Sequence, residues 1–389
     1  MKITAFANFA DPQTVPMYRA LYECSDHQLI LAATEPMEEK FLSLGWPDYN
    51  HELPFVRRLY ESDDPIREAE ELASKSDVLI YGHSPLAYFN LAVKSGRPVF
   101  RLSQHIYRDG DLSHVPLKMK LSYYLRHTVK LRHKPVYLMC LGAYTARDFA
   151  VTGSYKGKQF EFGEFPEVFP AEWEELKRAK EVQPLHAVWI SDLHPWYHPM
   201  DCLELAKRTA DLPVVFEMFG DGVLEAEVRS RMETEHLTNV TLHLKPSLSK
   251  LRESLKRASL YVFTPDANQG WGSSLNLAMN YGCACVVSTA AGASKMILHK
   301  QNGLLYESGS VDALEEAVRT LVQKEEMRLE LGRHAYESIL QTWNGTEAGK
   351  RFYQLISALT EGRPDPFDEG LCAPAVIRTP EEMIQRSRQ

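Results

Sequence analysis

The chain has 389 residues, of which 44% are hydrophobic and 25% charged, and its formal net charge is −8. This balance is that of a soluble globular protein with room for two or three domains, and the acidic charge argues against a nucleic-acid binder. No apolar run reaches the ~18–20 residues of a membrane-spanning helix, and the N-terminal MKITAFANFADP lacks the apolar core of a signal peptide. Six scattered cysteines give neither a zinc pattern nor a disulfide framework, so we expect a cytoplasmic chain without bound metal.

The first half of the sequence alternates short apolar runs with helix-like segments. Strands are predicted at residues 2–9, 27–34, 77–85, 97–105 and 135–142. Helices are predicted at residues 15–24, 65–76, 86–96, 118–133 and 143–153. Strands separated by short helices pair in parallel, with helices on both faces of the sheet. The pattern therefore predicts a doubly wound α/β domain over residues 1–165.

The alternation breaks at residues 166–184, where prolines bracket a charged helix with little apolar surface. This composition predicts a linker between domains. The alternation then restarts, with strands at 185–191, 212–222, 239–245, 260–265 and 283–289, and helices at 199–210, 223–237, 247–259, 273–282 and 311–341. A second doubly wound domain is thus predicted at 185–345. Residues 346–389 are predicted to be a terminal helix that packs back on the N-terminal domain, followed by a Pro-rich tail.

Two glycine turns of the second domain lie between a predicted strand and a predicted helix. FEMFGDGVLEAEV contains Gly220 and Gly222, and QGWGSSLNLAM contains Gly270 and Gly272. Glycines let the backbone come close to a phosphate, and the N-terminus of the following helix presents N–H groups to the anion. Plain strand-to-helix punctuation is the alternative for the first turn. The second join carries no charged side chain, although a phosphate would be expected to need one.

The order of elements from residue 239 to residue 321 is distinctive. A strand, a short helix, a strand, a Gly-aromatic-Gly turn, a helix, a strand, a Gly loop and an Asn-Gly pair follow one another, and Trp343-Asn344 opens the last helix. This closely resembles the C-terminal half of a family 4 glycosyltransferase of the GT-B fold, over about residues 185–356. Upstream, DVLIYGHSP and LGAYTARDFAVTGSYKGKQFEFGEFPE look like the N-terminal half of bacterial polysaccharide-type members. The resemblance implies two Rossmann-like domains facing across a cleft.

The resemblance also implies which residues bind the donor, a nucleotide-diphosphate sugar. In that family an Arg and a Lys pair with the diphosphate, and two Glu hold the sugar and the ribose. Here the Arg position falls near Asp192 and the two Glu positions fall on Gln269 and Leu277, so these ionic groups are not matched. The donor-binding residues implied are Tyr197 or His198 at the Lys position, Gly220, Gln269, Gly270, Trp271, Gly272, Ser273 and Ser274. We expect main-chain amides at 270–274 to bind the pyrophosphate, with no metal and no tightly bound cofactor.

Replacement positive charge has three candidate sources near this loop. They are His194, His198 and Lys295. The alternative interpretation is that all three are solvated loop residues. A glutamine at position 269 still hydrogen-bonds a sugar hydroxyl, but more weakly than a carboxylate does.

The first domain supplies the acceptor side of the predicted site. His105 ends the strand RPVFRLSQH, and the resemblance implies that a histidine near this strand end touches the transferred sugar. His83, in YGHSP, ends the preceding strand at the same sheet edge. Both are catalytic candidates, and ordinary loop histidines are the alternative. Asn8 and Asp11, after the first strand, are further lining candidates.

A local basic helix stands out on this acidic chain. Six cations and no acid lie between Pro116 and Pro135, and leucine or valine recurs at helical spacing: the cations are Lys118, Lys120, Arg126, Lys130, Arg132 and Lys134. One interpretation is a solvated helix face. The other is a surface that meets anionic lipid head groups or a lipid-diphosphate acceptor, which would make the protein peripheral on the inner face of the membrane.

Taken with the resemblance, these features predict a retaining glycosyltransferase. It would move a hexose from a nucleotide sugar to a glycan or lipid-linked acceptor in cell-envelope polysaccharide synthesis. Its chemistry would depend on the leaving diphosphate and on positioning rather than on a protein nucleophile. The alternative is a catalytically silent GT-B protein that serves as partner or scaffold for another glycosyltransferase, because the four usual donor-site groups are missing.

Overall fold

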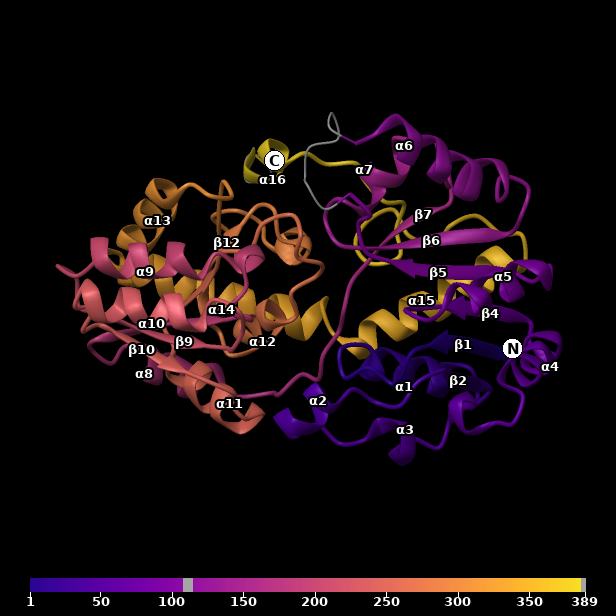
Figure 1. The fold of residues 1–389 in the computed structure, drawn as a ribbon, viewed down its shortest axis with the longest axis horizontal. Helices are drawn as coiled ribbons and strands as arrows, with labels where there is room; N and C mark the ends of the chain where they lie inside the picture. The colour runs from indigo at the N-terminus through magenta and orange to yellow at the C-terminus, as the bar shows by residue number, and fades with distance from the viewer. Residues whose placement is uncertain (108–114, 386–389) are drawn as a thin grey trace. The chain divides into compact units, whose positions relative to one another are not determined.

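The computed structural model describes residues 1–107 and 115–385, and within them the chain forms two compact units. The first unit comprises residues 1–107, 115–167 and 342–377. The second comprises residues 168–341 and 378–385. Each unit is built around a parallel sheet with helices on both faces (Figure 1).

The first unit contains a seven-stranded sheet of order β3-β2-β1-β4-β5-β6-β7, and every pairing is parallel. Its strands are β1 (Ile3–Ala7), β2 (Leu29–Ala33), β3 (Val56–Arg58), β4 (Val78–Tyr81), β5 (Val99–Ser103), β6 (Val136–Leu141) and β7 (Gln159–Phe162). In β1, an inner strand, Ile3 pairs with both Leu29 and Val78. Inner strands such as β2, β4 and β6 read as apolar runs because both faces of a parallel sheet are covered.

The helices of the first unit enclose two separate cores. They are α1 (Val15–Cys24), α2 (Glu39–Leu44), α3 (Tyr49–Glu52), η1 (Leu59–Glu61), α4 (Pro65–Lys75), α5 (Leu86–Lys94), α6 (Leu117–Tyr123), η3 (Tyr124–Val129), α7 (Thr145–Ala150) and α15 (Gly345–Thr360). Ala5 of β1 packs with α1 and α15, whereas its neighbour Phe6 packs with α4 and α5 on the other face. This alternation follows from the two-residue period of a strand. One predicted helix, 118–133, divides into α6 and the π-helical η3.

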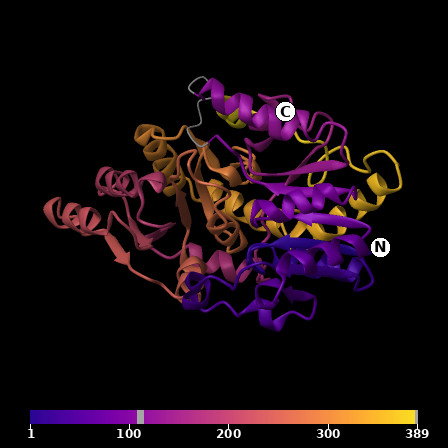
Figure 2. The ribbon, with the colours of Figure 1, turned by 45° about the vertical axis from the view of Figure 1, so that its right-hand side comes forward.

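Helix α15 comes from the end of the chain and packs against α1 near its beginning (Figures 1 and 2). Two glycines allow the close approach: a Cβ added at Gly345 would lie 2.4 Å from Cβ of Pro16, and one at Gly349 would lie 2.6 Å from Cβ of Ala20. Asn344 begins the helix, because its side chain accepts a hydrogen bond from the Glu347 N–H at 2.9 Å.

The second unit contains a six-stranded parallel sheet of order β10-β9-β8-β11-β12-β13. Its strands are β8 (Leu185–Ile190), β9 (Val214–Phe219), β10 (Val240–His243), β11 (Leu260–Phe263), β12 (Ala284–Ser288) and β13 (Leu304–Tyr306). Its helices are α8 (Trp173–Lys180), η4 (Pro195–Tyr197), α9 (Pro199–Arg208), α10 (Glu225–Thr234), α11 (Leu248–Arg257), α12 (Ser274–Asn280), η5 (Gly292–Met296), α13 (Val311–Gln323), α14 (Glu325–Gln341) and α16 (Pro380–Gln385). The strand order is that of a Rossmann fold.

The segment 166–184, expected to be a linker, contains a helix that is part of the second unit. Leu176 and Lys180 of α8 are buried. The Lys180 ammonium donates to the Ala258 carbonyl at 2.8 Å, and the Ser259 hydroxyl donates to the Lys180 carbonyl at 2.8 Å. Burial lowers the pKa of Lys180. This part of the segment is therefore held by core contacts, which its low apolar content did not indicate.

Candidate functional site

The candidate site of the second unit lies where its strand order reverses, between β8 and β11. In an open parallel sheet, ligands bind outside the carboxyl ends of the strands at this point. The two loops that leave it are joined directly: the Asp266 N–H donates to the Trp196 carbonyl at 2.9 Å, and the Thr264 hydroxyl donates to the Tyr197 carbonyl. Tyr197 is half-buried against the core. The loops after β8 and β11 therefore form one surface, which we call the second switch point (residues 191–198 and 264–273).

Gly220 and Gly222, after β9, allow this strand end to pack against the loop that follows β8. Both have positive φ angles, +154° and +151°, and a Cβ added at Gly220 would lie 1.8 Å from the Ser191 carbonyl oxygen. At Gly222 the added atom would lie 2.6 Å from the Leu193 carbonyl oxygen. The close approach that requires glycine at position 220 is thus an approach to the protein's own backbone. Gly220 shapes the switch point, whichever ligand binds there.

The Gly-Trp-Gly turn at 270–272 is held in place by contacts with neighbouring residues of the second unit. The Trp271 indole is buried and donates to the Asn276 side-chain oxygen at 2.8 Å. Gly272 has φ +87°, and an added Cβ would lie 2.4 Å from the Phe263 ring. The Gly270 carbonyl accepts from the Gly292 N–H at 3.1 Å. A ligand at this turn would therefore meet backbone rather than the indole, so the expected donor-binding role of Trp271 is limited to its main chain.

The polar side chains beside this turn are partly accessible. Gln269, Ser273 and Ser274 are all half-buried. The Ser274 hydroxyl is bonded to the Tyr261 hydroxyl at 2.8 Å, whereas Ser273, at the start of α12, makes no side-chain capping bond. Gln269 and Ser273 are thus the two side chains of the join best placed to bond a ligand hydroxyl or phosphate.

His198 lies between two carboxylates at the second switch point. Its Nδ1 is 3.4 Å from Asp201 and its Nε2 is 3.5 Å from Asp266. The hydrogen bond to Asp201 is the main cause that raises the pKa of His198, and the two negative charges add to it. The protonated group with its two partners carries a net charge of −1. His198 therefore ties the two loops together, and the expectation that it supplies spare positive charge to a diphosphate does not fit this arrangement.

The other two candidate cations are also engaged locally. His194 is half-buried, with its ring centroid 4.3 Å from that of Trp196. Lys295 is buried in η5. Asp192, near the position of the family's Arg, is half-buried.

The first unit has a corresponding switch point between β1 and β4. The Asn8 N–H donates to the His83 carbonyl at 2.5 Å, so the loops after these strands are adjacent. Asn8 is half-buried with its side-chain oxygen covered, and the His83 side chain is exposed. His105, after β5, is buried next to the Asp148 carboxylate, which accepts the Tyr107 N–H at 2.9 Å. Burial raises the pKa of Asp148. His83 and Asn8 therefore share one edge, and His105 is buried beside the Asp148 carboxylate.

Two carboxyl groups lie at this edge of the sheet, and only one of them, Asp11, was predicted from the sequence. Asp11 follows β1, and Glu164 follows β7; the Phe165 N–H donates to the Gln13 carbonyl at 2.7 Å and brings the two loops together. Burial raises the pKa of Asp11 to about 6. Burial and the Asp11 charge raise the pKa of Glu164 to about 8, although Gln104 donates to it at 2.9 Å. Glu164 was missed, and its place directly after a strand, in GEFPE, was the available signal.

The described residues show no group of three or more His, Cys, Asp or Glu side chains arranged to hold a metal ion. The carboxylates at each switch point are instead engaged by a histidine, a glutamine or backbone N–H groups.

Solved structures with the same architecture identify the fold. HepE from Anabaena, crystallised with UDP and glucose, aligns with a TM-score of 0.68 over 92% of this chain and 100% of that one, at 14% identity. The fold is GT-B. Sucrose-phosphate synthase from Thermosynechococcus elongatus gives a TM-score of 0.65 over 93% of this chain and 100% of that one, at 12% identity. TarM from S. aureus gives 0.55 over 75% of this chain and 59% of that one, at 17% identity.

The sequence of the second GT-B domain matches a family model. Residues 174–338 match the model described as glycosyl transferases group 1. Two uncharacterized glycosyltransferases of Methanocaldococcus jannaschii are each 24% identical, over 142 and 115 residues. These alignments cover 36% and 30% of this chain and only 37% and 29% of the relatives. The family match lies within the unit that carries the second switch point.

Proposed function

We propose that this protein is a retaining glycosyltransferase of the family 4 type. It transfers a hexose from a nucleotide-diphosphate sugar to a glycan or lipid-linked acceptor, in cell-envelope polysaccharide synthesis. The observation that carries the proposal is the match of residues 174–338 to glycosyl transferases group 1 on a GT-B fold. The UDP and glucose held by HepE support a nucleotide sugar as the donor.

On the donor side, the main-chain amides of residues 270–274 bind the diphosphate. The packed indole of Trp271 and the positive φ of Gly272 hold that backbone in place before the ligand arrives. Backbone N–H groups fixed in this way stabilise charge as it develops on the leaving diphosphate. Gln269 hydrogen-bonds a hydroxyl of the sugar, and His198, held by Asp201 and Asp266, keeps the loop after β8 in register with it.

On the acceptor side, the first switch point binds hydroxyl groups. Asn8 and Asp11 offer side-chain oxygen atoms there, and Glu164 adds a carboxyl group that is protonated at neutral pH, because the pKa of Glu164 is raised to about 8. A protonated carboxyl group donates one hydrogen bond and still accepts others. Such a group suits a polyhydroxylated acceptor, whose hydroxyls both donate and accept.

Titration calorimetry with UDP- and GDP-sugars tests the proposal, followed by assays for nucleotide diphosphate release. We expect heat with at least one donor, and release of the nucleoside diphosphate from that donor in the presence of acceptor. The absence of heat with every donor, for a protein whose circular dichroism is that of a folded chain, would overturn the transferase. It would favour the second candidate, a catalytically silent scaffold, which the −1 charge around His198 supports.

A substitution at Gln269 tests the donor assignment itself. Gln269→Glu restores the carboxylate that the family uses at this position. We expect sugar-nucleotide affinity to rise about fivefold, because a charged hydrogen bond is worth roughly 1 kcal/mol more than a neutral one. The matched control is Gln301→Glu, the same change on an exposed residue of the same unit, which should have no effect. Equal behaviour of the two variants would exclude Gln269 from the donor site.

A further inference from the structure

Helix α6 and the π-helical turn η3 expose a row of large apolar side chains. Leu117, Leu121 and Leu125, four residues apart, are 81%, 55% and 52% exposed. Three more members of the same segment are also exposed: Met119, Tyr124 and Val129. Single exposed leucines are common on soluble proteins, but a contiguous apolar patch of this kind marks an interaction surface.

The same segment carries unneutralised positive charge. No Asp or Glu occurs from Leu117 to Arg147, although the whole chain has a net charge of −8. In the part of the chain that the structure describes, no ion pair involves the six cations of residues 118–134. Lys130 is bonded only to an uncharged partner, the Asn90 side-chain oxygen, at 3.1 Å. We call residues 117–134 the basic apolar face.

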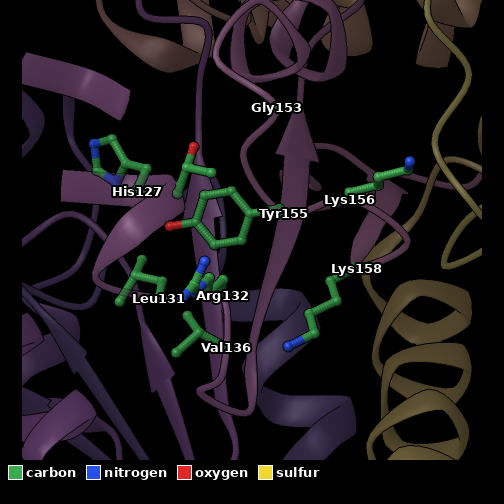
Figure 3. Close-up of a pocket in the computed structure, with 9 residues that line it drawn as sticks. His127, Leu131, Arg132, Val136, Gly153, Tyr155, Lys156 and Lys158 are labelled. Atoms are coloured by element: carbon green, nitrogen blue, oxygen red, sulfur yellow. The ribbon is translucent and has the colours of Figure 1, made fainter. Parts of the chain in front are cut away.

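A cavity opens beside this face and is lined by its residues. It has a volume of about 110 Å³. One side is formed by η3 and the turn that follows it, and the other by the 153–158 loop (Figure 3). The charged lining groups are all cationic: Arg132, Lys156 and Lys158. His127 bonds to the Arg101 guanidinium at 3.0 Å, and burial lowers the pKa of His127 to about 3, so its imidazole is neutral. The cavity has room for several waters or for one phosphate-sized anion.

We propose that the first unit docks on a membrane surface rich in anionic phospholipid, with a headgroup phosphate in the Arg132–Lys156–Lys158 cavity and the exposed leucines in the interface. Basic residues next to an apolar helical face are the composition that binds such surfaces. A second copy of the chain is a poorer occupant, because a two-fold interface would place this cationic face against itself. The inference is independent of the proposed transferase activity.

The strength of the interaction follows from the charges. Each lysine or arginine near an anionic surface strengthens binding by about fivefold, and the effect is screened by salt. Removing Arg132 and Lys156 together should therefore weaken binding roughly 25-fold. Placing a charge at Leu121 or Leu125 should weaken it by at least about tenfold, because the apolar burial is lost and a carboxylate is added.

Vesicle co-sedimentation of the full chain tests the proposal, with phosphatidylcholine vesicles that contain or lack phosphatidylglycerol. We expect binding only to the anionic vesicles, weakened by salt and by Leu121→Asp, Leu125→Asp and Arg132→Ser/Lys156→Ser. Matched controls on the second unit are Val223→Asp, at a residue 75% exposed, and Lys256→Ser, at an exposed residue of α11; both should bind like the wild type. The substituted leucines are exposed, so folding should be retained and is checked by circular dichroism.

Three outcomes of the vesicle assay would overturn the proposal. They are failure of the wild-type chain to bind anionic vesicles at low salt, equal binding to both vesicle types, and equal losses in the control variants. Sedimentation velocity without vesicles supplies a further arm, since a dimer abolished by Leu121→Asp would assign the face to self-association instead. Inorganic phosphate separates the sources of anion: binding of free phosphate without vesicle binding would also refute the membrane assignment.

Discussion

Glu164→Gln isolates the electrostatic cost of the carboxyl pair in the first unit. A carboxyl group whose pKa rises from 4.5 to about 8 disfavours the folded state by about 5 kcal/mol once it is ionised, at about 1.4 kcal/mol per pKa unit. The side chain is partly accessible, and solvent screening reduces this to about 2–4 kcal/mol. Glutamine keeps the hydrogen bond from Gln104, because it also has a side-chain oxygen acceptor.

The sign of the pH dependence follows from which state binds the proton. Below pH 4.5 the group is protonated in both states, and the raised pKa contributes its full stability. As the pH rises from 4.5 to about 8, only the unfolded chain ionises, so the wild type loses stability. The variant lacks this term, so its advantage should be near zero at pH 4 and reach its maximum above pH 8.

Scanning calorimetry from pH 4 to pH 9 measures the difference. The variant's unfolding midpoint should exceed that of the wild type by roughly 5–10 °C at high pH. Glu70→Gln, on an exposed residue of α4 in the same unit, is the control and should show no such trend. A difference between Glu164→Gln and wild type that does not change with pH would refute the raised pKa.

Three further predictions concern the second unit. Gly272→Ala should destabilise the second unit by about 1–3 kcal/mol, because φ is +87° and the new Cβ would meet the Phe263 ring. Thermal unfolding measures the change, and an unchanged unfolding midpoint would contradict this prediction. Trp271→Phe removes the bond to Asn276 and should cost about 1–2 kcal/mol in urea unfolding, with donor affinity lowered in parallel. His198→Gln should remove the contribution of the protonated histidine to the free energy of unfolding, which is complete below the ordinary pKa of 6.5 and is lost as the pH rises through the raised pKa of His198. Because the group is half-exposed, the effect should stay below about 1 kcal/mol. A variant whose stability shows the wild-type pH trend would contradict this prediction.

The sequence alone determined the layered architecture. Apolar runs such as LILAA at β2 and ACVVS at β12 are buried on both faces, and helices separate them, so parallel pairing follows from local pattern. The glycine turns at 220 and 272 could also be predicted, since a join between a strand and a helix often needs a backbone conformation that glycine adopts readily. These features depend on near neighbours in the chain, which periodicity reports directly.

Only the tertiary structure decided how the site residues are used. His198 meets Asp266 and Trp271 is buried because loops from different strands converge at the switch point, and no local pattern records that convergence. Glu164 acquires its raised pKa from burial and from the Asp11 charge, more than a hundred residues away in the sequence. The physical reason is that burial and charge interactions depend on distance in space, whereas propensity and periodicity act along the chain.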